Sequence, residues 1–282
     1  MPNPIKMATP SLTTHDLSIL QKIADPESGP SAPILIDSSL PKDPHYPDLQ
    51  TYSTITQAES SIISSIQQTE LQIAGLRPSP TDPSLDSALS TYQTAIKQLN
   101  ELISTFPNYA SARNNRAQAL RRVYGDAILI TSPEDAPRTN DEVSPLQKSA
   151  SESELLEAGS QMLNDLTHAI TLLTPSTPFS PLSLTATKTL SQAYTQRGAL
   201  YHLTAKHFSQ KGVELRVDDN RRERSWRILD FEEHASRDFM MGGRLGNEVA
   251  KQMAVVANPT AKLCGDMVRE AMRKEYAGGN AA

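Results

Sequence analysis

The polar side chains with the greatest capacity for binding are concentrated in two stretches of the sequence. The first stretch, Tyr109–Asp126, reads YASARNNRAQALRRVYGD. Asn is a weak helix former that favours caps and turns, so two adjacent Asn inside an Ala- and Leu-rich helix indicate a specific role. The second stretch surrounds Gly198 and carries Gln and His at corresponding positions. The residues that we predict to bind a peptide are Asn114, Asn115, Gln118, Arg121, Arg122, Gln192, Gln196 and His202.

These side chains are suited to hydrogen bonding rather than to bond-breaking chemistry. Amide and guanidinium groups can bind the backbone or the carboxylates of an extended peptide. No Ser-His-Asp, Cys-His or carboxylate-pair signature stands out, so the sequence predicts no catalytic residue and no cofactor. The six His show no paired spacing near Cys264, so no metal site is indicated. The GGRLG at 242–246 follows a helix rather than a strand, which argues against a dinucleotide-binding loop.

Two other interpretations of the polar residues remain open. They could form an ordinary solvated helix face. Alternatively, Arg121, Arg122 and His202 could surround a small anion, in an α-helical enzyme or in an anion-binding protein. An enzyme needs a closed, partly apolar pocket with convergent titratable groups, whereas a peptide-binding adaptor needs an open groove.

The spacing of apolar residues predicts helices along most of the chain. A short helix over 13–24 places Leu17, Leu20 and Ile23 on one face. The rest of 1–49 is rich in Pro, Ser and Asp and is predicted to be mostly disordered, as is the tail 277–282. No segment predicts a convincing strand, so the fold class is all-α. The main helices are expected over 50–76, 84–105, 109–124, 152–173, 185–207, 225–241, 247–256 and 260–276.

The helices match the pattern of tetratricopeptide repeats, which are helix-turn-helix units of about 34 residues. Ala117 and Gly198 occupy the small-residue position of the first helix, where the two helices of a repeat approach closely. Ala88-x3-Tyr92 and Ala235-x3-Phe239 fit the second helix. Loop insertions at 126–151, 174–184 and 208–224 interrupt the repeats. Residues 50–276 are therefore predicted to form an α-solenoid of about three irregular repeats, with N- and C-terminal flanking helices.

Two Arg–Asp combinations recur at matching repeat positions. Arg116 and Arg197 each stand immediately before the small residue of a first helix. Asp165 and Asp238 each stand immediately before the Leu or Phe of a second helix. Because the same combination occurs twice, we predict that each Arg bridges the two helices of its own repeat by a charge-assisted bond. The mixed-charge run at 216–227 is interpreted as a solvated helix start.

The overall composition limits the class of protein. The 282 residues carry a formal net charge of -5, which argues against nucleic acid as a partner. No apolar run is long enough to span a membrane, and the N-terminus lacks the apolar core of a secretory signal. The single cysteine, Cys264, excludes an internal disulfide framework, fits a reducing compartment and is expected to pack on an apolar helix face. The expected location is cytoplasmic, with the nucleus as a second location.

Five segments in order carry a closer resemblance. They are LSILQKIADPES, ASARNNRAQALRRVYGD, YTQRGALY, ASRDF and ANPTAKLCGDMV. Together they resemble the tetratricopeptide repeat protein 36 family, a small group with three such repeats and a C-terminal helix. The chain departs from the family in its long polar insertions and in one extra residue between Arg121 and Gly125.

The resemblance implies a non-enzymatic scaffold or adaptor that binds a protein or peptide partner in a concave groove. Some members of the family are linked to heat-shock chaperones and to the control of tyrosine breakdown. Chaperone-binding repeats hold a C-terminal carboxylate in a clamp of Lys, Arg and Asn, of which only Asn115 is clearly present here. Gln192 and Gln196 stand where the clamp has Lys and Arg, so a chaperone partner is not expected to bind through a full carboxylate clamp.

Overall fold

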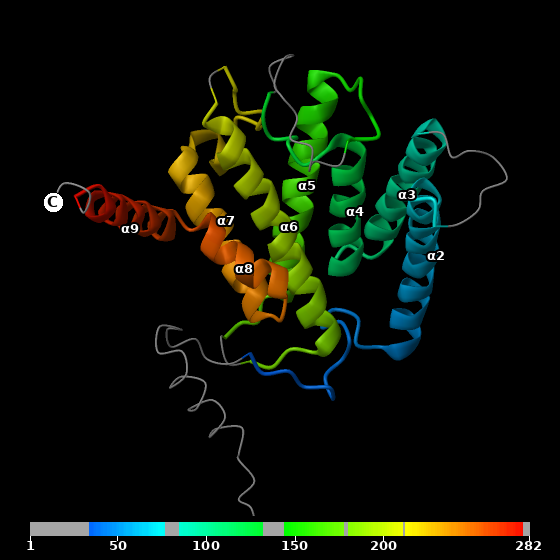
Figure 1. Ribbon diagram of the computed structural model, residues 1–282. Helices are drawn as coiled ribbons and strands as arrows, with labels where there is room; N and C mark the ends of the chain where they lie inside the picture. The colour runs from blue at the N-terminus through cyan, green and yellow to red at the C-terminus, as the bar shows by residue number, and fades with distance from the viewer. Residues whose placement is uncertain (1–33, 77–84, 132–143, 178–179, 211, 279–282) are drawn as a thin grey trace, which may run out of the picture.

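A computed structural model describes residues 34–76, 85–131, 144–177, 180–210 and 212–278, and its regular elements are helical (Figure 1). No strand occurs within these ranges, which contain only two isolated bridges between single residues. The all-α prediction is therefore confirmed. The helices are α2 (Leu49–Ile73), α3 (Leu85–Thr105), α4 (Ala110–Tyr124), α5 (Glu152–Leu173), α6 (Leu184–Phe208), the short 3-10 helix η1 (Arg222–Ser225), α7 (Ile228–Arg244), α8 (Glu248–Ala257) and α9 (Pro259–Gly278).

The helices pack in the order in which they follow along the chain. Contacts join α2 to α3, α4 to α5 and α6 to α7, which form repeats 1, 2 and 3, and each pair also contacts the next. Figure 1 shows the pairs following one another across the molecule from α2 to α7. This array confirms the predicted α-solenoid. Within each repeat the first helix is called helix A and the second helix B; α2, α4 and α6 are the A helices.

The predicted small residues lie where helices A and B approach closely. Ala117 is fully buried. A Cβ added to Gly198 would lie 3.1 Å from a ring carbon of Phe239 and 3.3 Å from the Ala235 carbonyl oxygen. Because those contacts are tighter than ordinary van der Waals distances, only Gly fits here without a shift of α7.

Residues 34–48 form an irregular segment of turns and bends, here called the strap, which crosses all three repeats. Its backbone pairs with the start of repeat 3, where the Asp37 amide donates to the Leu182 carbonyl oxygen at 2.9 Å. At its other end the ring of Tyr46 packs edge-on against Phe106 in the α3–α4 turn, 5.7 Å between centroids. The prediction of disorder through 1–49 is therefore wrong for 34–48, which lack apolar periodicity but bond through their backbone. The predicted helix 13–24 lies outside the described residues.

Two of the three predicted loop insertions pack on each other. The Arg216 amide donates to the Leu129 carbonyl oxygen at 2.7 Å, and the Thr131 amide donates to the Glu214 carbonyl oxygen at 2.8 Å. The adjoining Ile128, Leu129 and Ile130 are buried. The insertions at 126–151 and 208–224 thus contribute to the core instead of forming surface loops alone, while 132–143 lie outside the described residues.

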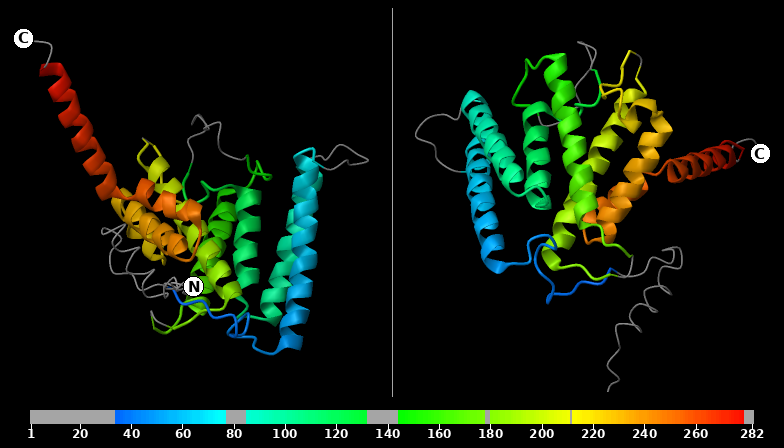
Figure 2. Two further views of the ribbon diagram at one scale, coloured as in Figure 1. Left: turned by 60° about the horizontal axis from the view of Figure 1, so that its bottom comes forward. Right: turned by 180° about the vertical axis from the view of Figure 1, so that it is seen from behind.

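The C-terminal helices α8 and α9 follow repeat 3. Helix α8 packs closely against α7, whereas α9 makes few contacts with either helix. Helix α9 points away from the rest of the structure (Figure 2, left). Cys264 on α9 is exposed, so the expectation that it packs on an apolar face is wrong for the described residues. Helix α9 extends to Gly278, beyond the predicted start of the tail, and 279–282 are not described. Within the described part of the chain, no helix combines the length and the apolar character needed to cross a bilayer.

Candidate functional site

The two adjacent Asn of α4 point to different neighbouring A helices. Asn114 faces α6, where its Oδ1 accepts a hydrogen bond from Gln196 Nε2 at 2.8 Å and its Nδ2 donates to Gln192 Oε1 at 3.3 Å. Asn115 faces α2 and donates from Nδ2 to Glu59 Oε1 at 2.8 Å. Successive residues of a helix project about 100° apart, so one pair of Asn can reach both neighbours. The unusual Asn pair therefore joins three repeats through their A helices.

Arg121 and Arg122 repeat this arrangement at the end of α4. Arg121 forms a two-bond ion pair with Asp126, 2.7 and 2.9 Å, and its Nη1 lies 3.4 Å from Gln196 Oε1. Arg122 donates from Nε to Glu70 of α2 at 2.8 Å. The predicted amides and guanidinium groups thus lie together on the A helices.

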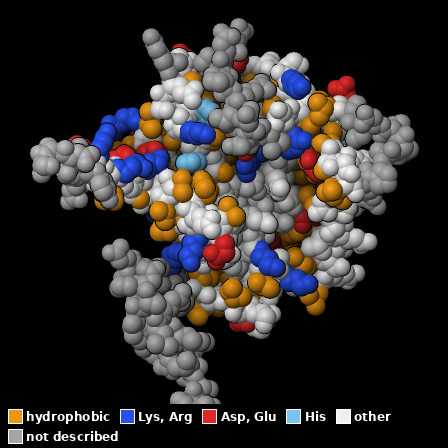
Figure 3. Space-filling view, viewed as in Figure 1, with side chains coloured by type: hydrophobic (Ala, Val, Ile, Leu, Met, Phe, Trp, Pro, Cys, Tyr) orange, Lys and Arg blue, Asp and Glu red, His pale blue; other side chains and the backbone are white. Residues whose placement is uncertain are grey.

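The bridging side chains keep part of their hydrogen-bonding capacity. Gln118 and Gln192 are exposed, and Asn115, Arg121 and Arg122 are partly exposed. In the space-filling view, basic side chains lie in several separate places among polar and apolar ones (Figure 3).

His202 lies apart from the other predicted residues. Its ring packs against Phe239 of α7 at 6.2 Å between centroids. The reason is that His202 follows Gly198 by four residues and so shares the face of α6 that packs on α7. Burial lowers the pKa of the His202 imidazole, and Lys262 and Lys206 lower it further.

Neither cavity described next brings Arg121, Arg122 and His202 together. One cavity of about 10 Å³ lies between the strap, α2, α4 and α6, with room for roughly one water molecule. The other, of about 340 Å³, is an open depression beside the start of α5. None of the eight predicted peptide-binding residues lines either cavity. The predicted concave groove is thus not one of these two cavities.

Glu59 is a functional candidate that the sequence did not reveal. Its buried carboxylate accepts hydrogen bonds from the Tyr109 hydroxyl at 2.6 Å and from Asn115 at 2.8 Å. Among the described residues no Lys or Arg forms a salt bridge with it, and burial raises the pKa of its carboxyl group. Helix A of repeat 1 has no recognisable repeat pattern, so no signal pointed to Glu59. A carboxylate clamp would use the side-chain NH2 group of Asn115, and this group already donates to the Glu59 carboxylate.

Replacing Glu59 with Gln should change the pH dependence of stability. A raised pKa means that the folded protein binds the proton more tightly than the unfolded chain, so this carboxyl group favours folding as pH falls through its folded pKa. The free energy of unfolding of the wild type minus that of Glu59→Gln should therefore be larger at pH 5 than at pH 8. Urea titrations at both pH values measure it, with the exposed Glu101→Gln as control. Parallel pH profiles of wild type and Glu59→Gln would contradict the expectation.

The two Arg–Asp pairs derived from the repeat register are both in contact. Arg116 donates from Nε and Nη2 to the two oxygens of Asp165 at 2.7 and 2.6 Å. Arg197 binds Asp238 in the same way at 2.7 and 2.8 Å. All four residues are buried, and Asp165 completely so. Each pair joins helix A to helix B within one repeat.

Each of these Arg also contacts helix B of the preceding repeat. Arg116 Nη1 donates to Asn100 of α3 at 2.7 Å, and Arg197 Nη1 donates to Thr167 of α5 at 3.3 Å. Asn100 therefore corresponds to Thr167. The residues before Asn100 and Thr167, which are Leu99 and Leu166, then occupy the same repeat position. The sequence pattern had placed Tyr92, seven residues before Leu99, at this position of α3.

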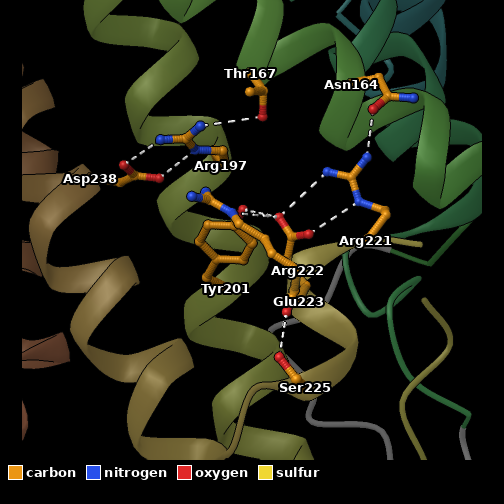
Figure 4. A network of polar contacts seen from close by, with 9 residues as sticks. All are labelled: Asn164, Thr167, Arg197, Tyr201, Arg221, Arg222, Glu223, Ser225 and Asp238. Carbon is orange, nitrogen blue, oxygen red and sulfur yellow. Dashed lines mark hydrogen bonds and ion pairs between the residues drawn. The ribbon is translucent and has the colours of Figure 1, made fainter. Parts of the chain in front are cut away.

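A further buried carboxylate, that of Glu223, lies in the charged run at 216–227. Glu223 is 1% exposed and accepts a hydrogen bond from the Tyr201 hydroxyl at 2.8 Å (Figure 4). Arg221 lies 3.2 Å from Glu223 and also donates to Asn164 of α5. The interpretation of this run as a solvated helix start is wrong for Glu223, because a mixed-charge run does not reveal which of its charges is buried.

An array of three antiparallel helix pairs, close-packed at small residues and joined by polar contacts between A helices, defines a tetratricopeptide-like helical repeat protein. Comparison with known proteins finds the L-tyrosine degradation gene cluster protein hmgX of Aspergillus fumigatus, 36% identical over 277 residues that cover 97% of both chains. This chain belongs to the hmgX family.

More distant relatives are two proteins named tetratricopeptide repeat protein 36. Those of Xenopus tropicalis and Danio rerio are each 29% identical over 64% of this chain, which spans 56% and 60% of their lengths. The resemblance inferred from the five sequence segments is therefore confirmed. No model of a known protein family matches the sequence, and no solved structure matches it.

Proposed function

We propose that this chain is a non-enzymatic adaptor that binds an extended peptide segment of a partner protein along α4 and α6. The observation that carries the proposal is how the amides between the A helices are used. Asn115 uses its Nδ2 to bind Glu59 of α2, so its Oδ1 can accept a hydrogen bond from a ligand. Gln192 uses its Oε1 to bind Asn114 of α4, so its Nε2 can donate one. The exposed Gln118 lies one helical turn from Asn115. Alternating donors and acceptors suit a peptide backbone.

The partner in this proposal is a protein of L-tyrosine degradation. The support is the name of the Aspergillus fumigatus relative, which aligns with nearly the whole chain. The proposed location is the cytoplasm, with the nucleus as a second location, since a lone Cys is typical of a reducing compartment. Binding of a heat-shock chaperone through a carboxylate clamp is not part of the proposal, because Asn115 already donates its side-chain hydrogen bond to Glu59.

The test compares Gln118→Ala combined with Gln192→Ala against the wild type. Both proteins are used to capture partners from cells grown on L-tyrosine, and the captured protein is then purified and titrated by calorimetry. Loss of two hydrogen bonds of about 1 kcal/mol each should weaken binding by roughly 10- to 30-fold. Gln93→Ala combined with Gln98→Ala, on the exposed face of α3, is the matched control. Equal affinities of the wild type and the α4–α6 variant would refute the proposed surface.

A further inference from the structure

The C-terminal end of the solenoid exposes an apolar stripe. On α9 the side chains of Leu263, Met267, Val268 and Met272 are at least half exposed and recur at helical spacing. On α8 the side chains of Val249, Val255 and Val256 are equally exposed. The terminal unit of a helical repeat array normally carries a polar outer face, because nothing stacks on it. An apolar stripe at this end is therefore expected to have a covering element.

The chain itself contains a segment suited to cover the stripe. Residues 13–24 read TTHDLSILQKIA and place Leu17, Leu20 and Ile23 on one face of a predicted helix. An isolated helix of this length is marginal in water, so it needs an apolar surface to pack against. The described structure begins at Ile34, which packs against the same core cluster as Ala250 and Ala257 of α8.

The connection is long enough to reach the stripe. The ten residues from Ala24 to Ile34 span at most about 33–36 Å when extended. The strap pairs through its backbone with Leu182, the residue before Ser183, which is the N-cap of α6. About 12 Å further along α6, Ser191 Oγ donates to the Gly242 carbonyl oxygen in the last turn of α7. The same oxygen accepts from the amide of Asn247, the N-cap of α8. Helix α8 adds roughly 15 Å, so its whole length lies within reach.

We infer that residues 13–24 dock as an amphipathic helix on the apolar stripe of α8 and α9 and so cap the C-terminal end of the solenoid. Leu17, Leu20 and Ile23 pack against the stripe, while Lys22 and Ser18 remain in solvent. The N-terminal segment then closes the array at repeat 3, next to the point where the strap begins. This inference does not depend on the proposed function.

Cys264 provides the test, because it is the single cysteine of the chain and lies beside Leu263 on the stripe. The rate at which a maleimide modifies Cys264 is measured in the full chain and in the variant Leu17→Ser, Leu20→Ser, Ile23→Ser. Docking should make the reaction at least about tenfold slower in the wild type than in the triple variant. Ser18→Ala combined with Lys22→Ala is the control and should react as slowly as the wild type. Circular dichroism melting curves show whether all variants remain folded.

A second measurement uses a disulfide. Leu20→Cys in the full chain should form an intramolecular bond with Cys264 under mild oxidation. Equal modification rates in the wild type and the triple variant, without that disulfide, would overturn the inference. Protection that persists in the triple variant and rises with protein concentration would assign the stripe to a second copy of the chain and would also overturn it.

Discussion

Replacing Asp165 with Ala is expected to lower the free energy of unfolding by about 3–5 kcal/mol, because it leaves a buried guanidinium without its counter-charge. Asp165 is fully buried and receives two bonds from Arg116, and Arg113 lies 3.5 Å from the same carboxylate. The loss would uncouple helix A from helix B in the central repeat. Urea denaturation monitored by circular dichroism measures the change.

A double-mutant cycle isolates the pair interaction. Arg197→Met and Asp238→Asn in repeat 3 should show strong coupling, because both side chains are nearly buried. The exposed pair Arg269–Asp266 on α9 is the matched control, and its coupling should be about 0–1 kcal/mol. Coupling in repeat 3 as small as in the control would show that the buried pairs add little to stability.

Glu223→Ala should release the insertion before α7 and lower the free energy of unfolding by about 3 kcal/mol. The variant leaves Arg221 and the buried Tyr201 hydroxyl without their common acceptor. Trypsin should then cleave the native protein faster at Arg221, Arg222 and Arg224. Glu223→Gln, which can still accept from Tyr201, should be intermediate. Unchanged cleavage in Glu223→Ala would show that the insertion is held mainly by its apolar contacts.

The effect of Glu223 should also depend on pH. Burial tends to raise the pKa of its carboxyl group, but the Tyr201 hydroxyl and the Arg221 guanidinium outweigh burial and hold the pKa below the usual 4.5. A lowered pKa contributes stability above the unfolded value, which is lost as pH falls through the folded pKa. The difference in stability between wild type and Glu223→Ala should therefore shrink as pH falls below about 4.5. A difference that stays constant to pH 3 would contradict this.

The helices and the two Arg–Asp pairs could be predicted because they depend on local spacing and on repetition. Arg116 and Arg197 stand at the same position relative to a small residue, so one repeat informs the other. The polar contacts of α4 could be predicted only in part. The repeat register placed Asn114 and Asn115 on the A-helix face, but helix A of repeat 1 gave no register, so the partner Glu59 was missed.

The strap and the paired insertions could not be predicted for a different reason. Their contacts are made largely by backbone groups. Examples are the Asp37 amide, which donates to the Leu182 carbonyl oxygen, and the Arg216 amide, which donates to that of Leu129. Pro- and Ser-rich segments carry no apolar periodicity, and backbone pairing between distant segments leaves no residue-level pattern. His202 was misplaced because its position relative to Gly198 directs it towards helix B.

The strap has a consequence for how the chain folds during synthesis. A simple repeat array can fold from its N-terminus as each unit leaves the ribosome, since every unit contacts only its neighbours. Here Lys42 accepts a hydrogen bond from Ser183, 141 positions later in the chain. The segment made first can therefore reach its final place only after the start of α6 has been translated. Until then repeat 1 must remain folded without the strap in its final position. Truncated chains that end before α6 lack the contacts that join all three repeats.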